Sequence, residues 1–408
     1  MKKSSNFGKF LLLWTGELIS SIGGGLTSFG LGVYIFNETG SAAGMALVTL
    51  LGFLPTLVLS IPAGILADRY DRRLLMMLGD GLSGLGILFI LIMMLLGKAT
   101  LPIICVGIFV SAVFSALLEP AYRSTITDLL TKEEYSRAGG LVSLAGSARY
   151  LLSPVIAGFL LAVSDVKLLL VIDISTFILT VAATAIVRKN IEAKEAAEPE
   201  PFLESMKFGW NTVHSKKGVF ALVMISSAIT LFMGVFQILA EPTVLSFTDS
   251  KTLGITETVC ASGMLVSGLF LGIKGIKKGF ANLLGISLLL AGCFIFCFGL
   301  KENIVLMCIS GFAFFAMLPF ANNALDYLTR TNIPDEVQGR AWGFIGFLSQ
   351  MGYVVAYAVS GVLADAIAKT SALSVGRASA LVIQVSGVLM AVVALFMLTN
   401  KNVRSLEK

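Results

Sequence analysis

Charged residues are scarce in this sequence, and their scarcity excludes most soluble proteins. Asp, Glu, Lys and Arg make up 13% of the 408 residues, whereas a soluble domain carries about 25% charged residues. The apolar share is 56% and the mean hydropathy is +0.89. In lipid, only helices and closed barrels satisfy their backbone hydrogen bonds, and long apolar runs favour helices. The composition therefore predicts an all-α membrane protein that crosses the bilayer many times.

Histidine is almost absent and cysteine is rare, which argues against an enzyme or a metal protein. His214 is the one histidine, and all five cysteines lie inside apolar runs, where they behave as small hydrophobic residues. The chain has no Gly-Lys-Ser/Thr phosphate loop and no pattern of a serine or cysteine triad. We therefore expect no enzyme activity, no cofactor, no metal and no nucleic-acid partner.

Twelve apolar segments are long enough to cross about 30 Å of hydrocarbon at 1.5 Å per residue. The first has no small-residue cleavage site, so we interpret it as a retained helix. The segments are 10–34, 44–67, 74–97, 101–129, 138–163 and 168–187, followed by 218–247, 256–273, 280–300, 304–329, 340–366 and 378–399.

Lysine and arginine are distributed unevenly between the loops. Twenty-three of the 30 fall in alternate loops and the termini, and six fall in the other loops. By the positive-inside rule, both termini and the central loop are then cytoplasmic. The chain divides into a six-helix half at 1–187, a linker at 188–217 and a second half at 218–408. The segments 120–140 and 319–343 share a proline, an acidic pair and an arginine, which indicates that the halves repeat.

The linker begins with acidic residues and then changes character. Phe202, Met206, Trp210 and Val213 recur at helical spacing. This pattern predicts an amphipathic helix on the inner membrane surface. About 30 residues are too few to build a separate soluble domain.

The stretch from Gly64 to Arg73 joins the second and third apolar segments. It places five charges in six positions, which predicts a very short loop between adjacent antiparallel helices. The stretch resembles the signature loop between helices 2 and 3 of the major facilitator superfamily, with Asp71 where that family usually has glycine. The resemblance implies a latch that closes the cytoplasmic side, formed here by Gly64, Asp68, Arg69, Arg72 and Arg73 with Asp128 at the end of segment four.

The pattern Gly-x-Leu-Ala-Asp occurs a second time, at 361–365. The topology puts this copy at the outer end of segment eleven. We therefore do not assign it a latch role.

Charges within membrane segments are costly and by default indicate function. Glu119 and Arg149 lie at matched depth in segments four and five, which predicts an ion pair or a shared wet cavity; a structural bridge is the alternative. Gly140, Arg149 and Ser153-Pro154 partly match a helix-5 motif of superfamily antiporters. Glu17 is a candidate proton carrier, or otherwise a buried, hydrogen-bonded acid.

Other polar residues in the segments are candidates of two kinds. Asp80, Asp173, Asp326 and Glu241 are possible transport acids, with a solvated helix end or a structural pair as the alternative. The candidates for the substrate cavity are Gln237, Asn322, Asn323 and Gln350. Such residues could also serve only to form hydrogen bonds between helices.

Within the superfamily, the sequence is similar to the macrolide-efflux branch. The supporting stretches are 51–55, 217–222 and 261–265, together with 68–72. The resemblance implies proton-coupled export of an amphipathic, macrolide-like drug across the plasma membrane by a monomer. Export of a siderophore or a lipid-like metabolite is one alternative, and a membrane sensor that transports nothing is another.

Overall fold

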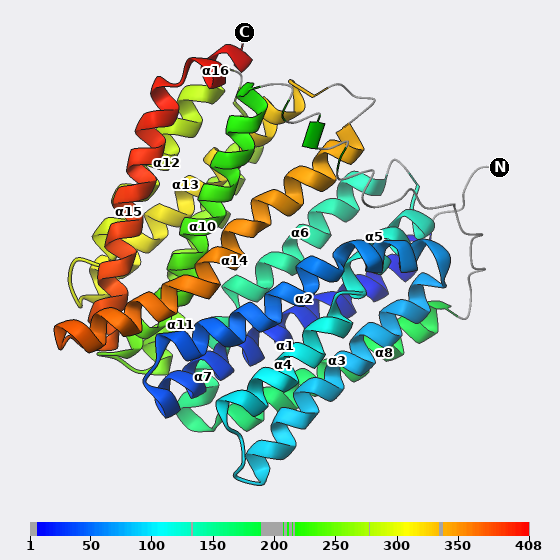
Figure 1. The fold of residues 1–408 in the computed structure, drawn as a ribbon. Coiled ribbons are helices and arrows are strands. Elements are labelled where there is room, and N and C mark those ends of the chain that lie inside the picture. The colour runs from blue at the N-terminus through cyan, green and yellow to red at the C-terminus, as the bar shows by residue number, and fades with distance from the viewer. Residues whose placement is uncertain are drawn as a thin grey trace. The chain divides into compact units, whose positions relative to one another are not determined.

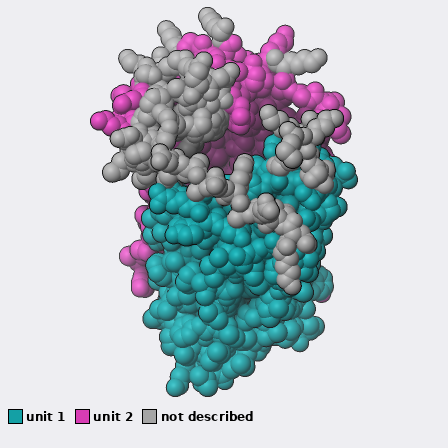
Figure 2. Space-filling model, turned by 90° about the vertical axis from the view of Figure 1, so that its right-hand side faces the viewer, with its two compact units in different colours: residues 1–38, 47–199 teal, residues 39–46, 200–408 magenta. Residues whose placement is uncertain are grey.

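The computed structural model describes residues 6–131, 134–188, 207, 210–211, 214, 217–276, 278–333 and 338–407. Twelve helical spans in these ranges are long and apolar enough to cross a membrane, which confirms the predicted number and the all-α class. The chain forms two compact units (Figures 1 and 2). Unit 1 comprises residues 1–38 and 47–199, and unit 2 comprises residues 39–46 and 200–408.

Six spans before the linker region supply the helices of unit 1. The fourth and fifth spans are each built from two consecutive helices, a division that the hydropathy pattern does not predict. Pro154 is the second residue of the helix that follows the second break, because proline lacks the backbone N–H that an interior helical position needs. The helices are α1 (Phe7–Thr39), α2 (Ala42–Arg69), α3 (Arg72–Leu95), α4 (Leu101–Ser115), α5 (Leu118–Leu129), α6 (Tyr135–Leu151), α7 (Ser153–Val163) and α8 (Val166–Arg188).

Helix α1 packs closely on its neighbours in unit 1 through glycine. A Cβ atom on Gly23 would lie 2.6 Å from Thr176 Oγ1, and one on Gly25 would lie 3.1 Å from the carbonyl oxygen of Arg149. The indole of Trp14 donates a 2.6 Å hydrogen bond to the carbonyl of Leu141. These contacts bring α8 and the α6–α7 junction against α1, where several polar side chains gather.

After the linker, the helices of unit 2 begin with α10. Two of its long helices are capped by the side chain that precedes their first turn. Asn303 and Ser374 accept hydrogen bonds from the first turns of the helices that follow them. At the other end of the chain, Glu407 accepts from three backbone N–H groups at the start of α12. The elements are α10 (Lys217–Leu245), α11 (Ser250–Lys274), α12 (Phe280–Phe298), α13 (Ile304–Arg330), α14 (Gln338–Ser371), α15 (Val375–Thr399), α16 (Lys401–Arg404) and the 3-10 turn η3 (Ser405–Glu407).

The predicted amphipathic helix of the linker falls mostly outside the described residues. Of the residues assigned to its apolar face, the structure describes Trp210. Its ring stacks on His214 and meets Phe220 and Phe344 edge-on. The proposed surface helix and the boundaries at 187 and 218 therefore stay predictions.

Candidate functional site

The loop after α2 places two arginines against one carboxylate of α5. Arg72 Nη1 lies 2.8 Å from Asp128 Oδ1, and Arg73 Nη2 lies 3.8 Å from Asp128 Oδ2. Arg73 is buried and Asp128 is largely so. Asp71 caps α3 by accepting from the Arg73 backbone N–H, so the turn itself aims both guanidinium groups at α5. With Asp68, which lies 3.7 Å from Arg72 Nη2, the structure brings together four of the six residues expected in the latch.

Asp68 lies at the exposed edge of this cluster, and Arg69 and Gly64 add no contact to it among the described residues. Asp68 is half exposed, and its Oδ1 lies 3.7 Å from Arg72 Nη2. Arg69 is exposed, and a Cβ atom on Gly64 would meet nothing within 4 Å. A hydrogen bond from a facing helix N-terminus to Asp68 and a close helix contact at Gly64 would complete such a latch. Neither is present among the described residues.

Asp71 also binds the end of α8. Its carboxylate accepts a 2.7 Å hydrogen bond from Arg188 Nε. Partial burial alone would raise the pKa of Asp71, but the Arg188 hydrogen bond, the Arg73 backbone N–H and the two guanidinium charges together lower it. The acid is therefore ionised throughout the physiological range and holds the loop to α8.

Asp173 is the most deeply buried acid of unit 1. Its side chain is 1% exposed and accepts hydrogen bonds from the hydroxyl of Thr27 on α1 at 2.6 Å and from that of Thr176 at 3.5 Å. Gly23 leaves room for it, since a Cβ atom there would lie 2.8 Å from Asp173 Oδ1. A carboxyl group held by neutral donors in this way can exist in either protonation state without losing its place.

Three acids of unit 1 interact electrostatically through this interior, and we call them the unit 1 acid cluster: Glu17, Asp80 and Asp173. Asp80 on α3 is also buried, at 5% exposure. It interacts electrostatically with Glu17 and Asp173. Arg149 is the cation that acts on both Glu17 and Asp173. The cluster therefore combines three acids and one base contributed by four helices.

The predicted ion pair between Glu119 and Arg149 is wrong. Glu119 instead pairs with Arg123 one turn away at 2.5 Å, and both side chains are about 70% exposed. Among the described residues, Arg149 forms no ion pair, and its influence on Glu17 and Asp173 is exerted at longer range. Glu119 and Arg149 both interact electrostatically with Glu17, and the shared wet cavity that the sequence also allowed stays a prediction.

Arg149, Ser153 and Pro154 of the partial antiporter motif lie where α6 ends and α7 begins, whereas Gly140 lies near the start of α6. Ser153 donates a 3.0 Å hydrogen bond to the carbonyl of Ile22 on α1. Gly25 of α1 faces the same junction, where a Cβ atom would collide with the Ser153 side chain. The motif thus supplies close packing between α1 and α7, and the same packing positions Arg149 one turn before the break.

In unit 2 one of the cavity candidates has an oriented amide. Gln237 on α10 is exposed, and its Oε1 accepts a 2.7 Å hydrogen bond from the hydroxyl of buried Tyr357 on α14. The ring of Tyr353 lies 5.7 Å from that of Tyr357. Because its oxygen is occupied, the Gln237 amide presents its two N–H donors outward.

The other candidates of unit 2 are dispersed along α13 and α14. Asn322 and Asn323 are exposed side by side on α13, and Gln350 is half-buried on α14. Asp326 forms an exposed 2.8 Å pair with Arg330 one turn away. That pair satisfies the carboxylate at a solvated helix end, the alternative that the sequence left open for it.

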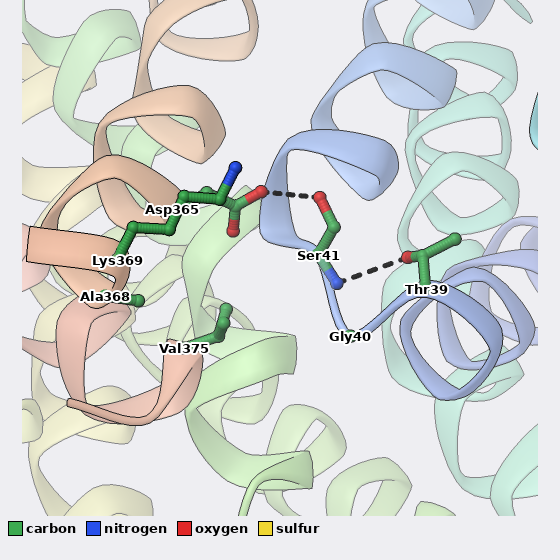
Figure 3. Close-up of a pocket in the computed structure, with 7 residues that line it drawn as sticks. All are labelled: Thr39, Gly40, Ser41, Asp365, Ala368, Lys369 and Val375. Carbon is green, nitrogen blue, oxygen red and sulfur yellow. Dashed lines mark hydrogen bonds between the residues drawn. The ribbon is translucent and has the colours of Figure 1, made fainter. Parts of the chain in front are cut away.

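The segment 361–365 makes the contacts that its counterpart at 64–68 lacks. Asp365 accepts hydrogen bonds from the Ser41 hydroxyl at 2.5 Å and from the backbone N–H groups of Ala42 at 3.0 Å and Ala43 at 3.2 Å. All of these residues belong to unit 2. Ser41 and Asp365 border a cavity of about 370 Å³ (Figure 3). These contacts could not be predicted from the sequence, because they join segments more than 320 residues apart.

No group of three or more His, Cys, Asp or Glu side chains in the described part of the chain could hold a metal ion. The unit 1 acid cluster is therefore an arrangement of separate acids linked through charge. Acids arranged in this way can take up and release protons or attract a cationic group.

Comparison with known proteins agrees with this architecture. A model of the Major Facilitator Superfamily matches residues 13–357. Macrolide efflux protein A of Streptococcus pyogenes is 26% identical over 383 residues, covering 90% of this chain and 92% of that protein. The multidrug efflux pump Tap of Mycolicibacterium fortuitum is 24% identical over 379 residues, covering 88% of this chain and 90% of the pump.

Solved structures show the same fold. A bacterial homologue of the iron transporter ferroportin, in an inward-facing state, superposes with a TM-score of 0.76 at 14% identity over 97% of this chain and all of the other. A bacterial homologue of the human lysosomal transporter Spinster gives 0.70 at 15% identity, covering 97% of this chain and 96% of the other.

Proposed function

Since the chain belongs to the major facilitator superfamily, whose members are transporters and not enzymes, we propose that it exports an amphipathic, macrolide-like solute in exchange for protons. Its relatives named as efflux proteins support the direction of transport and the class of solute. Transporters of this superfamily work by alternating access, in which two repeats of helices take part.

The proposal of proton coupling rests on the unit 1 acid cluster. Asp80 and Asp173 are almost without contact with solvent, and a buried acid at membrane depth is costly unless it has a use. Asp173 is held by the hydroxyls of Thr27 and Thr176, which keep it in place through protonation. Arg149 acts on both Glu17 and Asp173, so protonation of one acid changes the balance of charge felt by the other.

The solute side of the proposal rests on unit 2. The outward N–H donors of Gln237 and the neighbouring rings of Tyr353 and Tyr357 combine hydrogen bonding with apolar surface. Such a face suits a large solute rich in ether, ester and hydroxyl oxygens. Asn322, Asn323 and Gln350 extend the polar part of the proposed cavity.

The orientation and the latch complete the proposal. We place both termini on the cytoplasmic side of the plasma membrane, because the basic residues gather in the loops on that side. The cluster of Arg72, Arg73 and Asp128 then lies at the cytoplasmic end of unit 1, as an inner latch to which Asp68, Arg69 and Gly64 would contribute when the site opens outward.

Uptake of a labelled macrolide into everted membrane vesicles tests this function. We expect accumulation driven by an imposed proton gradient and abolished by an uncoupler. Asp173→Asn, which keeps the shape of the side chain but cannot release a proton, should reduce gradient-driven uptake at least about tenfold while the binding of the macrolide is retained.

Asp165→Asn is the matched control. Asp165 is exposed before α8 and pairs with Lys167 at 3.1 Å, so its substitution should leave uptake close to that of the unaltered protein. Uptake that ignores the proton gradient would refute the coupling. A panel of drugs, siderophores and lipids in an efflux-deficient host would show whether another solute is the true substrate.

A further inference from the structure

Asp365 and Ser41 together accept hydrogen bonds from the backbone N–H groups at the start of α2. Ser41 Oγ accepts from the backbone N–H of Gly44 at 3.1 Å, and Asp365 accepts from those of Ala42 and Ala43. The first N–H groups of a helix have no partner within it. A carboxylate at this end also interacts favourably with the helix dipole. The start of α2 is therefore capped by a side chain that lies more than 320 positions away in the sequence.

Gly361, one turn before Asp365, fits directly against the same turn of α2. A Cβ atom on Gly361 would lie 2.6 Å from the carbonyl oxygen of Ala42, 2.7 Å from Ala46 Cβ and 2.8 Å from Ala43 Cα. Ala364 is completely buried. The small residues of the 361–365 segment thus let the two backbones touch, and the carboxylate completes the contact with hydrogen bonds.

Helix α2 is divided between the two units at this point. Residues 39–46 belong to unit 2, whereas the helix from residue 47 onward belongs to unit 1. If the units move relative to each other during transport, α2 must either detach from α14 or bend within itself. Pro55 and Pro62 inside α2 are the positions at which bending would occur.

We propose that Asp365 is a positioning residue of the transport cycle, which holds the first turn of α2 on α14 in one state and releases it in another. We call this contact, made by Asp365, Gly361, Ser41, Ala42 and Ala43, the second latch. The two copies of the five-residue pattern differ in their contacts. In the copy at 64–68, a Cβ atom on the glycine would meet nothing within 4 Å, and the aspartate is half exposed. Among the described residues, the helix contact is complete at 361–365 and not made at 64–68, as two alternating latches require.

The burial of Met45 offers a readout that does not depend on the solute or on protons. Its side chain is 4% exposed in the first turn of α2, and cysteine is smaller than methionine, so Met45→Cys introduces a shielded thiol without crowding. The five native cysteines are first replaced. The rate at which N-ethylmaleimide labels this thiol in native membranes then reports release of the turn.

We expect Asp365→Ala to raise the labelling rate about tenfold, which corresponds to about 1.4 kcal/mol, and Ser41→Ala to raise it less. Asp365→Asn retains one hydrogen-bond acceptor and should fall between Asp365→Ala and the unaltered protein. Asp249→Asn is the matched control, because Asp249 caps α11 through Thr252 and does not touch α2. It should leave the labelling rate unchanged.

Transport supplies the second readout and rests on the proposed function. With a labelled macrolide, Asp365→Ala should change the maximal rate per molecule several-fold while KM stays near its original value, since the contact lies away from the proposed solute face. A purely structural cap would lower the yield of folded protein and leave the rate per molecule unaltered. If Asp365→Ala prevents folding, Gly361→Ala tests the same contact by steric displacement.

Labelling that is equally slow with Asp365→Ala and Gly361→Ala would overturn the second latch and favour bending at the prolines. If labelling responds as expected but no macrolide is transported, the latch stands and the proposed solute is wrong.

Discussion

Residues 64–68 and 361–365 share four of five residues, yet the chain uses them in different ways. The second copy packs its glycine on the backbone of α2 and engages its aspartate in three hydrogen bonds. The first copy leaves its glycine open and its aspartate half exposed, while the nearby arginines bind Asp128 instead. The short motif therefore provides a surface of small residues and a carboxylate. The residues that face the motif determine whether these groups make contacts.

The largest expected effect concerns Asp128, which lies closer to Arg72 than Asp68 does. Asp128→Ala would leave the buried charge of Arg73 without this carboxylate, and we expect a loss of about 3 kcal/mol of unfolding free energy. Asp68→Ala should cost less than about 1 kcal/mol, because its contact with Arg72 is long and half exposed. Thermal unfolding in detergent measures both, and equal losses would mean that the first copy is as engaged as the second.

The two glycines give the next comparison. Gly361→Val would force a branched side chain into the backbone of α2 and should cost about 2 kcal/mol. Gly64→Val meets open space and should change stability by no more than about 0.5 kcal/mol. The same unfolding assay applies, and a Gly64 variant as damaging as the Gly361 variant would contradict the structure of the first copy.

The pH dependence of the loop beside the first copy is smaller. The pKa of Asp71 is lowered in the folded chain, so its contribution is present above the pKa of the unfolded chain, about 3.9, and is lost as the pH falls through the lower folded value. Asp71→Asn should remove less than about 1 kcal/mol at neutral pH, because the pair with Arg188 is partly exposed.

Unfolding curves between about pH 2 and pH 7 test this prediction. The difference between Asp71→Asn and the unaltered protein should vanish at the acidic end. A difference that persists there would assign the effect to packing.

The smallest effect is expected at the exposed pair of Glu119 and Arg123. Glu119→Gln should change stability by about 0.3 to 0.5 kcal/mol, as for other exposed pairs one turn apart. Its effect should add to that of Arg149→Ala, with a coupling energy near zero in a double-mutant cycle. A large coupling energy would restore the partnership that the sequence suggested and the structure does not contain.

Much of the fold could be predicted because lipid imposes a simple rule. Apolar runs such as 74–97 and 168–187 correspond closely to α3 and α8, since every spanning segment must satisfy its own backbone. The proximity of Arg72, Arg73 and Asp128 also followed from a local loop and a resemblance. The partners of Arg149 could not be predicted, because depth along a helix says nothing about the face on which a side chain lies.

By itself, the sequence determined the number of membrane spans, the position of the short charged loop and the scarcity of groups that could perform chemistry. These are properties of single segments, governed by hydropathy and backbone hydrogen bonding. Only the tertiary structure decided that Asp173 meets Thr27, that Glu119 turns to Arg123, and that Asp365 caps α2. Such pairings depend on the rotation and crossing of helices, which arise from close packing between segments far apart in the chain.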